Sequence, residues 1–364
     1  MLTLPGLIDP HVHMREPGQT HKEDWYSGTA AALAGGFTCV LAMPNTEPPL
    51  TDLPSYELAE ESARKKAVCD YGLFLGAGEE NVESAAALAP KTAGLKMYLD
   101  KTFGPLRLAD PNAVSAHMAN WPKEKPIVVH AEGKSIALAI QICARLGRSL
   151  HIAHVSRKKE ILLVKAAKEK GLAVTCEVAP HHLFLTKEDI PRIGAGRAEV
   201  RPKLAAPADR QALWDNLAVI DCFATDHAPH TLAEKDGESP PPGFPGLETA
   251  LALLLGAARE GKLTVEDVLK RMVDNPRRIF HLPEQFDTLI EVDLDARWTV
   301  RGQYLQSRCG WSPFEGMPLR GKVVEVCLRG RTVYQTPDIL VSPGYGKNVV
   351  GTKLVPDPVK PIPM

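Results

Sequence analysis

Eight short apolar segments, separated by helix-like stretches, occupy the first 230 residues of this chain. Their nearly continuous hydrophobic character is typical of parallel strands that are buried on both faces. A strand–helix unit that repeats eight times predicts an α/β fold in which the strands close into a (β/α)8 TIM barrel. The predicted strands span residues 6–13, 37–43, 71–77, 94–99, 126–131, 149–155, 172–178 and 219–225.

Stretches of helical periodicity lie between these strands and complete the repeat. The segment from Lys158 to Lys170 has an apolar stripe and a basic face, as expected for a helix that packs on a barrel and faces water. The predicted helices of the barrel span residues 24–33, 55–66, 79–88, 112–120, 134–146, 158–170 and 210–217.

The pattern changes after residue 230. A segment rich in proline and glycine, residues 238–246, predicts a stiff loop beside the mouth of the barrel. Asn275-Pro276 is expected to end the second of two helices, and Arg329-Gly330-Arg331 is expected to form a tight turn. These helices are predicted at 247–260 and 264–273, and short strands at 289–292, 322–329 and 331–334.

This change of pattern suggests two domains. Residues 1–286 are predicted to form the barrel, and residues 287–364 a small β-rich appendage. Its last residues are expected to form an extended tail because prolines recur there. These prolines are Pro356, Pro358, Pro361 and Pro363.

Side chains that can bind a metal ion stand at the ends of several predicted strands. His11 and His13 belong to one strand, and residues i and i+2 of a strand point to the same face, so both can hold one ion. His130, His154 and Asp226 end three later strands. Barrel enzymes build their active sites at this carboxyl end. Because a structural zinc more often uses clustered cysteines, the sequence predicts a metal-dependent hydrolase.

The overall composition excludes several other functions. Lys plus Arg (43) nearly balance Asp plus Glu (44), so no global field favours nucleic acid or an anionic membrane. No apolar run approaches the roughly 20 residues that span a bilayer, and the start of the chain lacks the layout of a signal peptide. Seven scattered cysteines indicate reduced thiols. We therefore expect a cytoplasmic protein without nucleic-acid or membrane partners.

Five motifs in order along the chain resemble the dihydroorotases of the amidohydrolase superfamily. The resemblance is greatest to the CAD type, which forms one domain of a multifunctional pyrimidine-synthesis polypeptide. It implies the amidohydrolase fold and the reversible cyclisation of N-carbamoyl-L-aspartate to L-dihydroorotate. The motifs are PGLIDPHVHMREPG at 5–18, AMPNT at 42–46, GLKMYL at 94–99, DHAPH at 226–230 and PPGFPGLET at 241–249.

The resemblance implies a site with two zinc ions. Lys96 would bridge the ions after carboxylation by CO2, because an ammonium has no lone pair to offer a metal. Asp226 would also be the catalytic residue that accepts and returns a proton. The implied ligands are His11, His13 and Asp226 for one ion and His130 and His154 for the other.

The resemblance also assigns contacts to the anionic substrate. Arg15 can pair with a carboxylate through its planar guanidinium, and Asn45 can offer an amide donor. The implied substrate-binding residues are Arg15, Asn45, Arg201, His230 and the main chain of Pro242. Thr102 and Phe103 occupy the position of a mobile loop that closes over substrate in CAD-type members.

A third zinc is doubtful in this chain. CAD-type members can hold one with a cysteine before the sixth-strand histidine and a glutamate at the end of the seventh strand. The glutamate is present as Glu177, but the cysteine position is Ala153, which has no ligand atom. We therefore expect two zinc ions per chain.

Two other functions remain open from the sequence. A related cyclic amidase, hydantoinase or allantoinase, would share the barrel, the lysine and the metals, although Arg15 would then be buried without a partner. A non-catalytic dihydroorotase-like structural domain is the other alternative, but such domains usually lose ligands. The expected partners are the small-molecule substrate, a second copy in a homodimer, and the rest of a larger multifunctional polypeptide.

Overall fold

The eight predicted parallel strands are present and follow one another in chain order. The computed structural model describes residues 1–351, and the predicted tail with its four prolines lies outside them. Strands β2 to β9 form one parallel sheet in the order β2-β3-β4-β5-β6-β7-β8-β9. Their bounds are β2 (Leu7–Val12), β3 (Phe37–Ala42), β4 (Asp70–Gly76), β5 (Gly94–Tyr98), β6 (Ile127–His130), β7 (Leu150–Ile152), β8 (Val174–Val178) and β9 (Cys222–Phe223).

The first and last strands of this sheet meet through a short bridge and a buried carboxylate. Val12 pairs with His227 in an isolated parallel bridge. The prediction of a strand over 219–225 was wrong at both ends, because β9 has two residues. Thr225 donates its amide and its hydroxyl to the carboxylate of Asp9. These hydrogen bonds take the place of a regular ladder between β9 and β2. Asp9 therefore lies at the seam where the nearly closed barrel joins.

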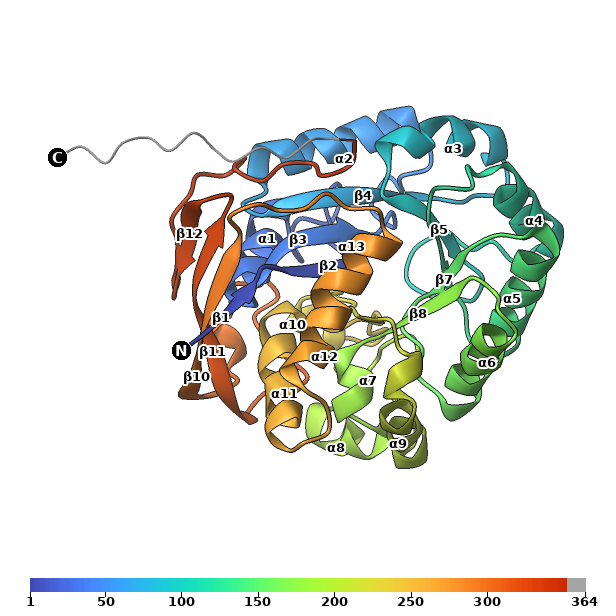
Figure 1. Cartoon of the computed structure of the whole chain (residues 1–364). Helices are drawn as coiled ribbons and strands as arrows, with labels where there is room; N and C mark the ends of the chain where they lie inside the picture. The colour runs from blue at the N-terminus through green and yellow to red at the C-terminus, as the bar shows by residue number, and fades with distance from the viewer. Residues whose placement is uncertain (352–364) are drawn as a thin grey trace.

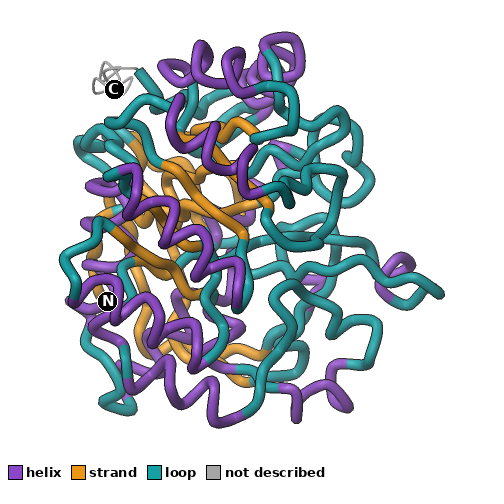
Figure 2. Tube along the Cα trace, turned by 90° about the vertical axis from the view of Figure 1, so that its right-hand side faces the viewer, coloured by secondary structure: helices purple, strands orange, loops and turns teal. Residues whose placement is uncertain are grey.

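Helices surround the strands, as both views of the chain show (Figures 1 and 2). Helix α5 buries Ile136, Ala139, Ile140 and Cys143 and ends at Gly147, which has a left-handed conformation that suits glycine. Three short helices, α7, α8 and α10, were not predicted. The helices up to residue 235 are α1 (Trp25–Ala34), α2 (Leu53–Lys66), α3 (Val82–Leu88), α4 (Pro111–Asn120), α5 (Lys134–Leu146), α6 (Lys158–Glu169), α7 (Pro180–Phe184), α8 (Ile190–Ile193), α9 (Pro207–Asp215) and α10 (Leu232–Lys235).

The helices after the proline-rich loop differ from the prediction in one respect. Helix α11 (Leu247–Arg259) is followed by α12 (Val265–Leu269), a π-helical segment and α13 (Asn275–Ile279). The expectation that Asn275-Pro276 stops the helix was wrong. Pro276 lies in the first turn of α13, where the amide that proline lacks needs no partner within the helix.

A second sheet lies beside the barrel and is antiparallel. Its strands are β1 (Leu2–Pro5), β10 (Leu289–Thr299), β11 (Pro318–Leu328), β12 (Arg331–Gln335) and β13 (Asp338–Ile339), in the order β1-β10-β11-β12-β13. The predicted turn between β11 and β12 is confirmed, since Arg329 and Gly330 both have positive φ. Strand β1 was not predicted. It brings the first residues of the chain into the appended sheet (Figure 1).

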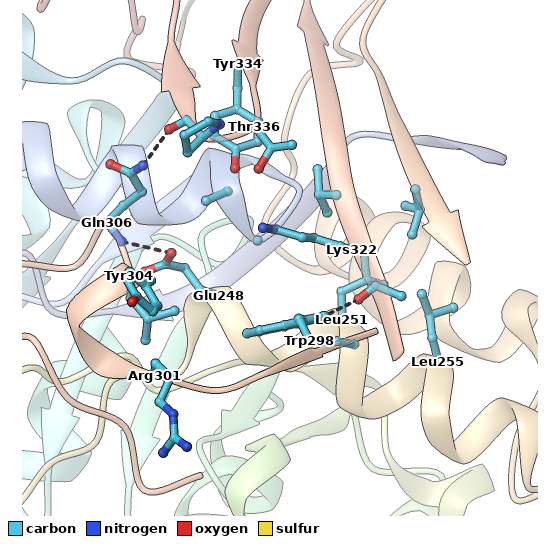
Figure 3. A pocket seen from close by; sticks show the side chains of 18 of the residues that line it. Glu248, Leu251, Leu255, Trp298, Arg301, Tyr304, Gln306, Lys322, Tyr334 and Thr336 are labelled. Carbon is cyan, nitrogen blue, oxygen red and sulfur yellow. Dashed lines mark hydrogen bonds between the residues drawn. The ribbon is translucent and has the colours of Figure 1, made fainter. Parts of the chain in front are cut away.

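The junction between the barrel and the appended sheet contains both a buried ion pair and a cavity. The guanidinium of Arg329, 1% exposed, pairs with the buried carboxylate of Asp70 in β4. A cavity of about 230 Å3 lies between α11 and the strands of the appended sheet, as Figure 3 shows. Leu251 and Leu255 of α11 line its apolar side.

None of the helices formed by residues 1–351 combines the length and the apolar character that crossing a membrane requires.

Candidate active site

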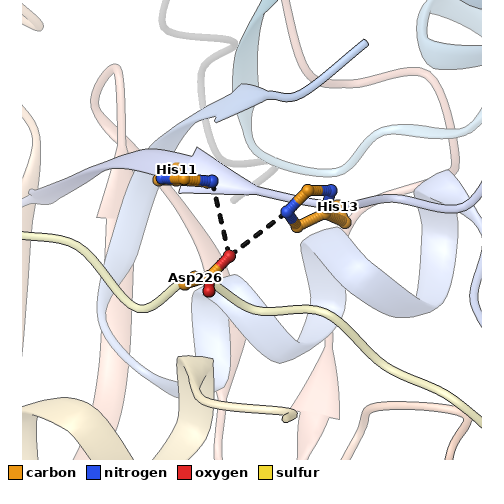
Figure 4. Close-up of side chains that lie close together, drawn as sticks. All are labelled: His11, His13 and Asp226. Atoms are coloured by element: carbon orange, nitrogen blue, oxygen red, sulfur yellow. Dashed lines mark hydrogen bonds and ion pairs between the residues drawn. The ribbon is translucent and has the colours of Figure 1, made fainter. Parts of the chain in front are cut away.

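Three of the predicted ligands converge at the seam of the barrel. The Nε2 atoms of His11 and His13 lie 3.4 and 3.2 Å from Oδ1 of Asp226 (Figure 4). All three side chains are buried, and one ligand atom from each lies within 4.8 Å of the others. Two imidazoles and a carboxylate in this arrangement are suited to a divalent cation such as zinc.

Hydrogen bonds on the far side of each ring orient these histidines. Nδ1 of His13 lies 2.6 Å from Oδ1 of Asn45, and Nδ1 of His11 is paired with Glu177. Both bonds leave Nε2 to face Asp226. Burial lowers the pKa of both histidines, so the rings are neutral and their lone pairs are free for a cation.

Glu177 contacts histidines with both of its oxygens. Oε1 is paired with Nδ1 of His11, and Oε2 lies 3.1 Å from Nε2 of His151. Burial opposes ionisation of Glu177, but its contacts with His11 and His151 hold its pKa well below the ordinary value. Within residues 1–351, the group of possible metal ligands around His11 does not include Glu177. Its geometry is that of a carboxylate that orients a metal ligand.

The predicted ligands of the second ion also lie close together. Nδ1 of His130 is 2.8 Å from Nε2 of His154. The other ring nitrogens, Nε2 of His130 and Nδ1 of His154, are buried and have no hydrogen-bond partner among the described residues. Burial lowers the pKa of both rings far below 6.5. Two neutral imidazoles with an unused nitrogen each again fit a cation.

Lys96 is the predicted bridge between the two groups. Its side chain is 0% exposed, and Nζ has no hydrogen-bond partner among the residues that the structure describes. Besides burial, the charge of Lys96 lowers the pKa of His11, His130 and His154, which belong to both groups. Burial lowers the pKa of Lys96 itself to about 8. Burying an amine without a hydrogen-bond partner costs free energy, so this position favours a lysine that gains a partner.

Strained backbone marks several of these positions. Arg15, His154 and Asp226 have φ angles of 57°, 34° and 49°, in the left-handed region that non-glycine residues rarely adopt. Such conformations cost roughly 1–3 kcal/mol each and persist where the surrounding structure enforces them, often at functional sites. Three of the predicted site residues therefore hold backbone conformations that are unfavourable for their residue type and that the surrounding structure must maintain.

Arg15 has one nitrogen without a partner. Its Nε donates to the carbonyl of Pro229 at 3.0 Å, and Nη2 lies 3.0 Å from Nε2 of His230. Nη1 is buried and has no hydrogen-bond partner within residues 1–351. Burial lowers the pKa of Arg15 to about 10, so the guanidinium stays charged at neutral pH. A buried cation with an unused donor is suited to an anionic ligand.

Arg201 and Pro242 line one pocket together with His11, His13 and Asp226, and His230 contacts Pro242. Nε2 of His230 lies 3.1 Å from the carbonyl of Pro242. Arg201 donates to the carboxylate of Glu199 at 2.8 Å and to the carbonyl of Val200 at 3.0 Å. Two of these predicted substrate contacts, Arg201 and Pro242, therefore line the pocket, and His230 contacts the lining residues Arg15 and Pro242.

The predicted loop residues cover the pocket in this structure. The ring of Phe103 is 5.1 Å from the guanidinium carbon of Arg15 and 4.9 Å from the ring of His230. Nδ2 of Asn45 donates to the carbonyl of Phe103 at 3.2 Å. Asn45, predicted to donate to substrate, thus already contacts His13 with its oxygen and the loop with its nitrogen.

Tyr98 and Asp9 contribute to this site and were not predicted. Tyr98 lines the pocket, and its buried hydroxyl has no hydrogen-bond partner among the described residues. Its place two residues after Lys96 on a strand could have revealed it. Asp9 lies within the first motif, yet its role at the seam depends on Thr225, which no local pattern predicts. The pocket is lined by His11, His13, Arg15, Asn45, Tyr98, Thr102, Phe103, His130, His154, Arg201, Asp226, Ala228, Pro242 and Gly243.

Comparison of the sequence with known proteins gives a consistent family. A model of the amidohydrolase family matches residues 2–291. The chain is 51% identical over 362 residues to the multifunctional protein CAD of Squalus acanthias, covering 98% of this chain but 16% of that protein. It is 39% identical to the dihydroorotase of Pyrococcus horikoshii, covering 96% of this chain and 84% of that enzyme.

Solved structures agree with the fold. An L-hydantoinase from Arthrobacter aurescens matches with a TM-score of 0.90 at 24% identity, covering 96% of this chain and 89% of that one. An inactive dihydroorotase-like domain from a CAD-like protein of Chaetomium thermophilum matches with a TM-score of 0.82 at 30% identity, covering 95% and 98%. The hydantoinase likeness concerns the fold alone. The chain belongs to the amidohydrolase family, and its relatives include multifunctional CAD proteins and archaeal dihydroorotases.

Proposed function

We propose that this chain is a zinc-dependent dihydroorotase that interconverts N-carbamoyl-L-aspartate and L-dihydroorotate in pyrimidine biosynthesis. One observation carries the proposal most directly. The group formed by His11, His13 and Asp226 shares a pocket with Arg15, a buried cation that has an unused donor nitrogen. A metal-dependent hydrolase with such a cation is suited to an anionic substrate, and dihydroorotate carries a carboxylate.

Two zinc ions would occupy the site, and the residues present fit them. When bound, the ions would polarise the amide carbonyl and acidify a water molecule. Lys96 supports this arrangement because its lowered pKa leaves part of the amine unprotonated, and the free amine is the form that adds CO2. Addition of CO2 releases one proton and turns the amine into an anionic carbamate. The proposed ligands are His11, His13 and Asp226, then His130 and His154, with carboxylated Lys96 between the two groups.

Asp226 carries the proton in this proposal. In hydrolysis it accepts a proton from the attacking water and returns it to the ring nitrogen as the carbon–nitrogen bond breaks. In the synthetic direction the same transfers run in reverse. Burial raises the pKa of Asp226 above its ordinary value, which makes proton uptake easier. Its position between two histidines keeps the carboxylate aimed at the pocket.

The remaining pocket residues would bind the substrate. Arg15 would pair with its carboxylate through the free nitrogen, while Arg201, His230 and the main chain of Pro242 complete the wall. Thr102 and Phe103 would form the mobile loop that excludes water. Asn45 would join the loop to His13 and offer its remaining amide hydrogen to substrate.

The two alternatives are separated by turnover and by metal content. Zinc-loaded protein should hydrolyse dihydroorotate and leave hydantoin and allantoin nearly untouched, because neither places a carboxylate at Arg15. Preferential turnover of hydantoin or allantoin would favour the cyclic amidase. An intact fold that binds zinc but turns over none of the three would favour a structural domain like that of the Chaetomium thermophilum protein.

The larger assembly is also a proposal. The chain spans 16% of the length of the shark CAD protein that it resembles, which supports a role as the dihydroorotase unit of a multifunctional polypeptide. The homodimer and the cytoplasmic location stay predictions. Sedimentation of the purified chain would test the first of these, and a fluorescent fusion the second.

A further inference from the structure

A buried lysine outside the proposed metal site joins two segments of the pocket wall. Lys235, the last residue of α10, is 0% exposed. Its ammonium donates to the carbonyl of Glu199 at 2.6 Å, to that of Pro241 at 2.9 Å and to that of Gly243 at 3.2 Å. All three donor hydrogens of an ammonium therefore have backbone acceptors.

These carbonyls belong to the two segments that bring Arg201 and Pro242 to the pocket. One segment is 199–201 and the other is 241–243, and the amide of Gly243 also donates to the carbonyl of Glu199 at 3.0 Å. The loop contains three successive prolines before Gly243, so few of its own amides can hold it in place. The lysine supplies the donors that these prolines lack.

We propose that Lys235 is a positioning residue for the substrate. Its buried ammonium ties segment 199–201 to segment 241–243 and thereby fixes the backbone that presents Arg201 and Pro242. This inference rests on the proposed function. It adds to that function a residue that does not itself line the pocket and belongs to none of the five motifs.

The surroundings of Lys235 make this anchor sensitive to pH. Burial lowers its pKa to about 7; the charge of Glu199 opposes the shift, and Arg15 and Arg201 add to it. The rings of Phe244 and Trp311 lie 5.7 and 5.5 Å from Nζ. Below pH 7 the ammonium offers three hydrogens to three carbonyls. Above pH 7 the neutral amine offers two hydrogens, and its lone pair faces the remaining carbonyl.

The central test compares Lys235→Met with Lys235→Gln in the zinc-loaded protein. Methionine keeps the length of the side chain and removes every donor, whereas glutamine keeps an uncharged amide donor. We expect KM for dihydroorotate to rise about 10-fold or more in Lys235→Met. The free energy of one hydrogen bond that involves a charged group corresponds to about a tenfold change or more in an equilibrium constant. The glutamine variant should lie between it and the parent protein. The turnover number should change less than about twofold, because His11, His13 and Asp226 stand on other segments.

A matched control is Lys262→Met. Lys262 lies 5.8 Å from the ring of Trp214 on the surface and has no role in the pocket, so its loss should leave KM unchanged. The pH profile gives a second comparison. KM of the parent protein should rise between about pH 6 and pH 8.5, and this rise should disappear in Lys235→Met.

Hydrogen exchange measures the anchor without substrate or turnover. The amides of residues 199–201 and 243–246 should exchange faster in Lys235→Met, while zinc content stays that of the parent protein. A Lys235→Met variant that unfolds at a lower temperature but keeps the parent KM and the parent exchange rates in these segments would overturn the proposal. If the parent protein failed to turn over dihydroorotate, the proposed function would fail while exchange still decided the role of Lys235.

Discussion

Two cavities of this molecule, the candidate active site and the cavity beside the appended sheet, differ in size and chemistry. The candidate active site encloses about 20 Å3, and its walls carry four histidines, an aspartate and two arginines. The cavity at the appended sheet encloses about 230 Å3, and Leu251, Leu255 and Val323 line it together with polar residues such as Glu248 and Lys322. Of these two cavities, the second offers more volume. The first cavity is nevertheless the better candidate for an active site. Its neutral histidines converge on a carboxylate, and buried donors beside them have no partner among the described residues, whereas a large volume alone provides no catalytic group.

The largest effect is expected from Asp226→Asn. The substitution removes an anionic ligand and the proposed proton carrier, so turnover should fall by roughly 10²–10⁴-fold from the loss of acid–base help alone, and further through weaker metal binding. Steady-state kinetics with zinc analysis would measure both. Turnover within tenfold of the parent protein would place the chemistry elsewhere.

The second-largest effect is expected from Lys96→Ala. The variant loses the proposed anionic bridge, so activity and zinc content should both collapse. Short carboxylates added to the solution should restore part of the activity, because they can occupy the space of the missing carbamate. Near-normal turnover without an additive would contradict the bridging role.

Glu177→Gln tests whether this carboxylate orients a ligand or binds a third ion. We expect two zinc ions per chain at saturation, held about 10–100-fold more weakly, since Glu177 orients His11 and does not bind the ion itself. Zinc titration against a chelator would report the affinity. Three tightly held ions in the parent protein, with one missing in the variant, would instead show that Glu177 belongs to a third zinc site.

The smallest effect is expected at the larger cavity. Ala252→Leu would fill part of the space beside α11, and filling such a cavity typically adds about 0.5–2 kcal/mol of stability. Turnover of dihydroorotate should stay within about twofold of the parent value. A large loss of activity would show that the two cavities are coupled.

The sequence predicted the barrel well because its signals are local and repeated. Most barrel strands are nearly continuous apolar runs, and α5 agrees at both ends with the predicted 134–146. Errors arose where side chains from distant segments decide the backbone. Strand β9 is shortened by Asp9, more than 200 residues earlier in the chain, and β1 depends on pairing with β10. The division into domains at residue 286 stays a prediction.

The site was predictable to the extent that motifs carry it. Spacing alone placed His11 and His13 on one face of a strand, and the family resemblance supplied Lys96 and Arg201. The engagement of Asn45 with both His13 and Phe103 could not be predicted, because it depends on where a loop lies relative to a strand. The contacts of Lys235 could not be predicted either. Its three acceptors are backbone carbonyls, which every type of residue carries.

The seam of the barrel also sets the order in which the site can come into existence during synthesis. His13 and Asp226 are 213 residues apart in sequence, yet they meet across the last joint of the barrel to be made. A growing chain that has not yet released residue 226 from the ribosome carries both histidines but cannot bring the carboxylate to them. Metal capture at this centre would then occur late, and a tightly bound ion would report that the first and last strands have joined.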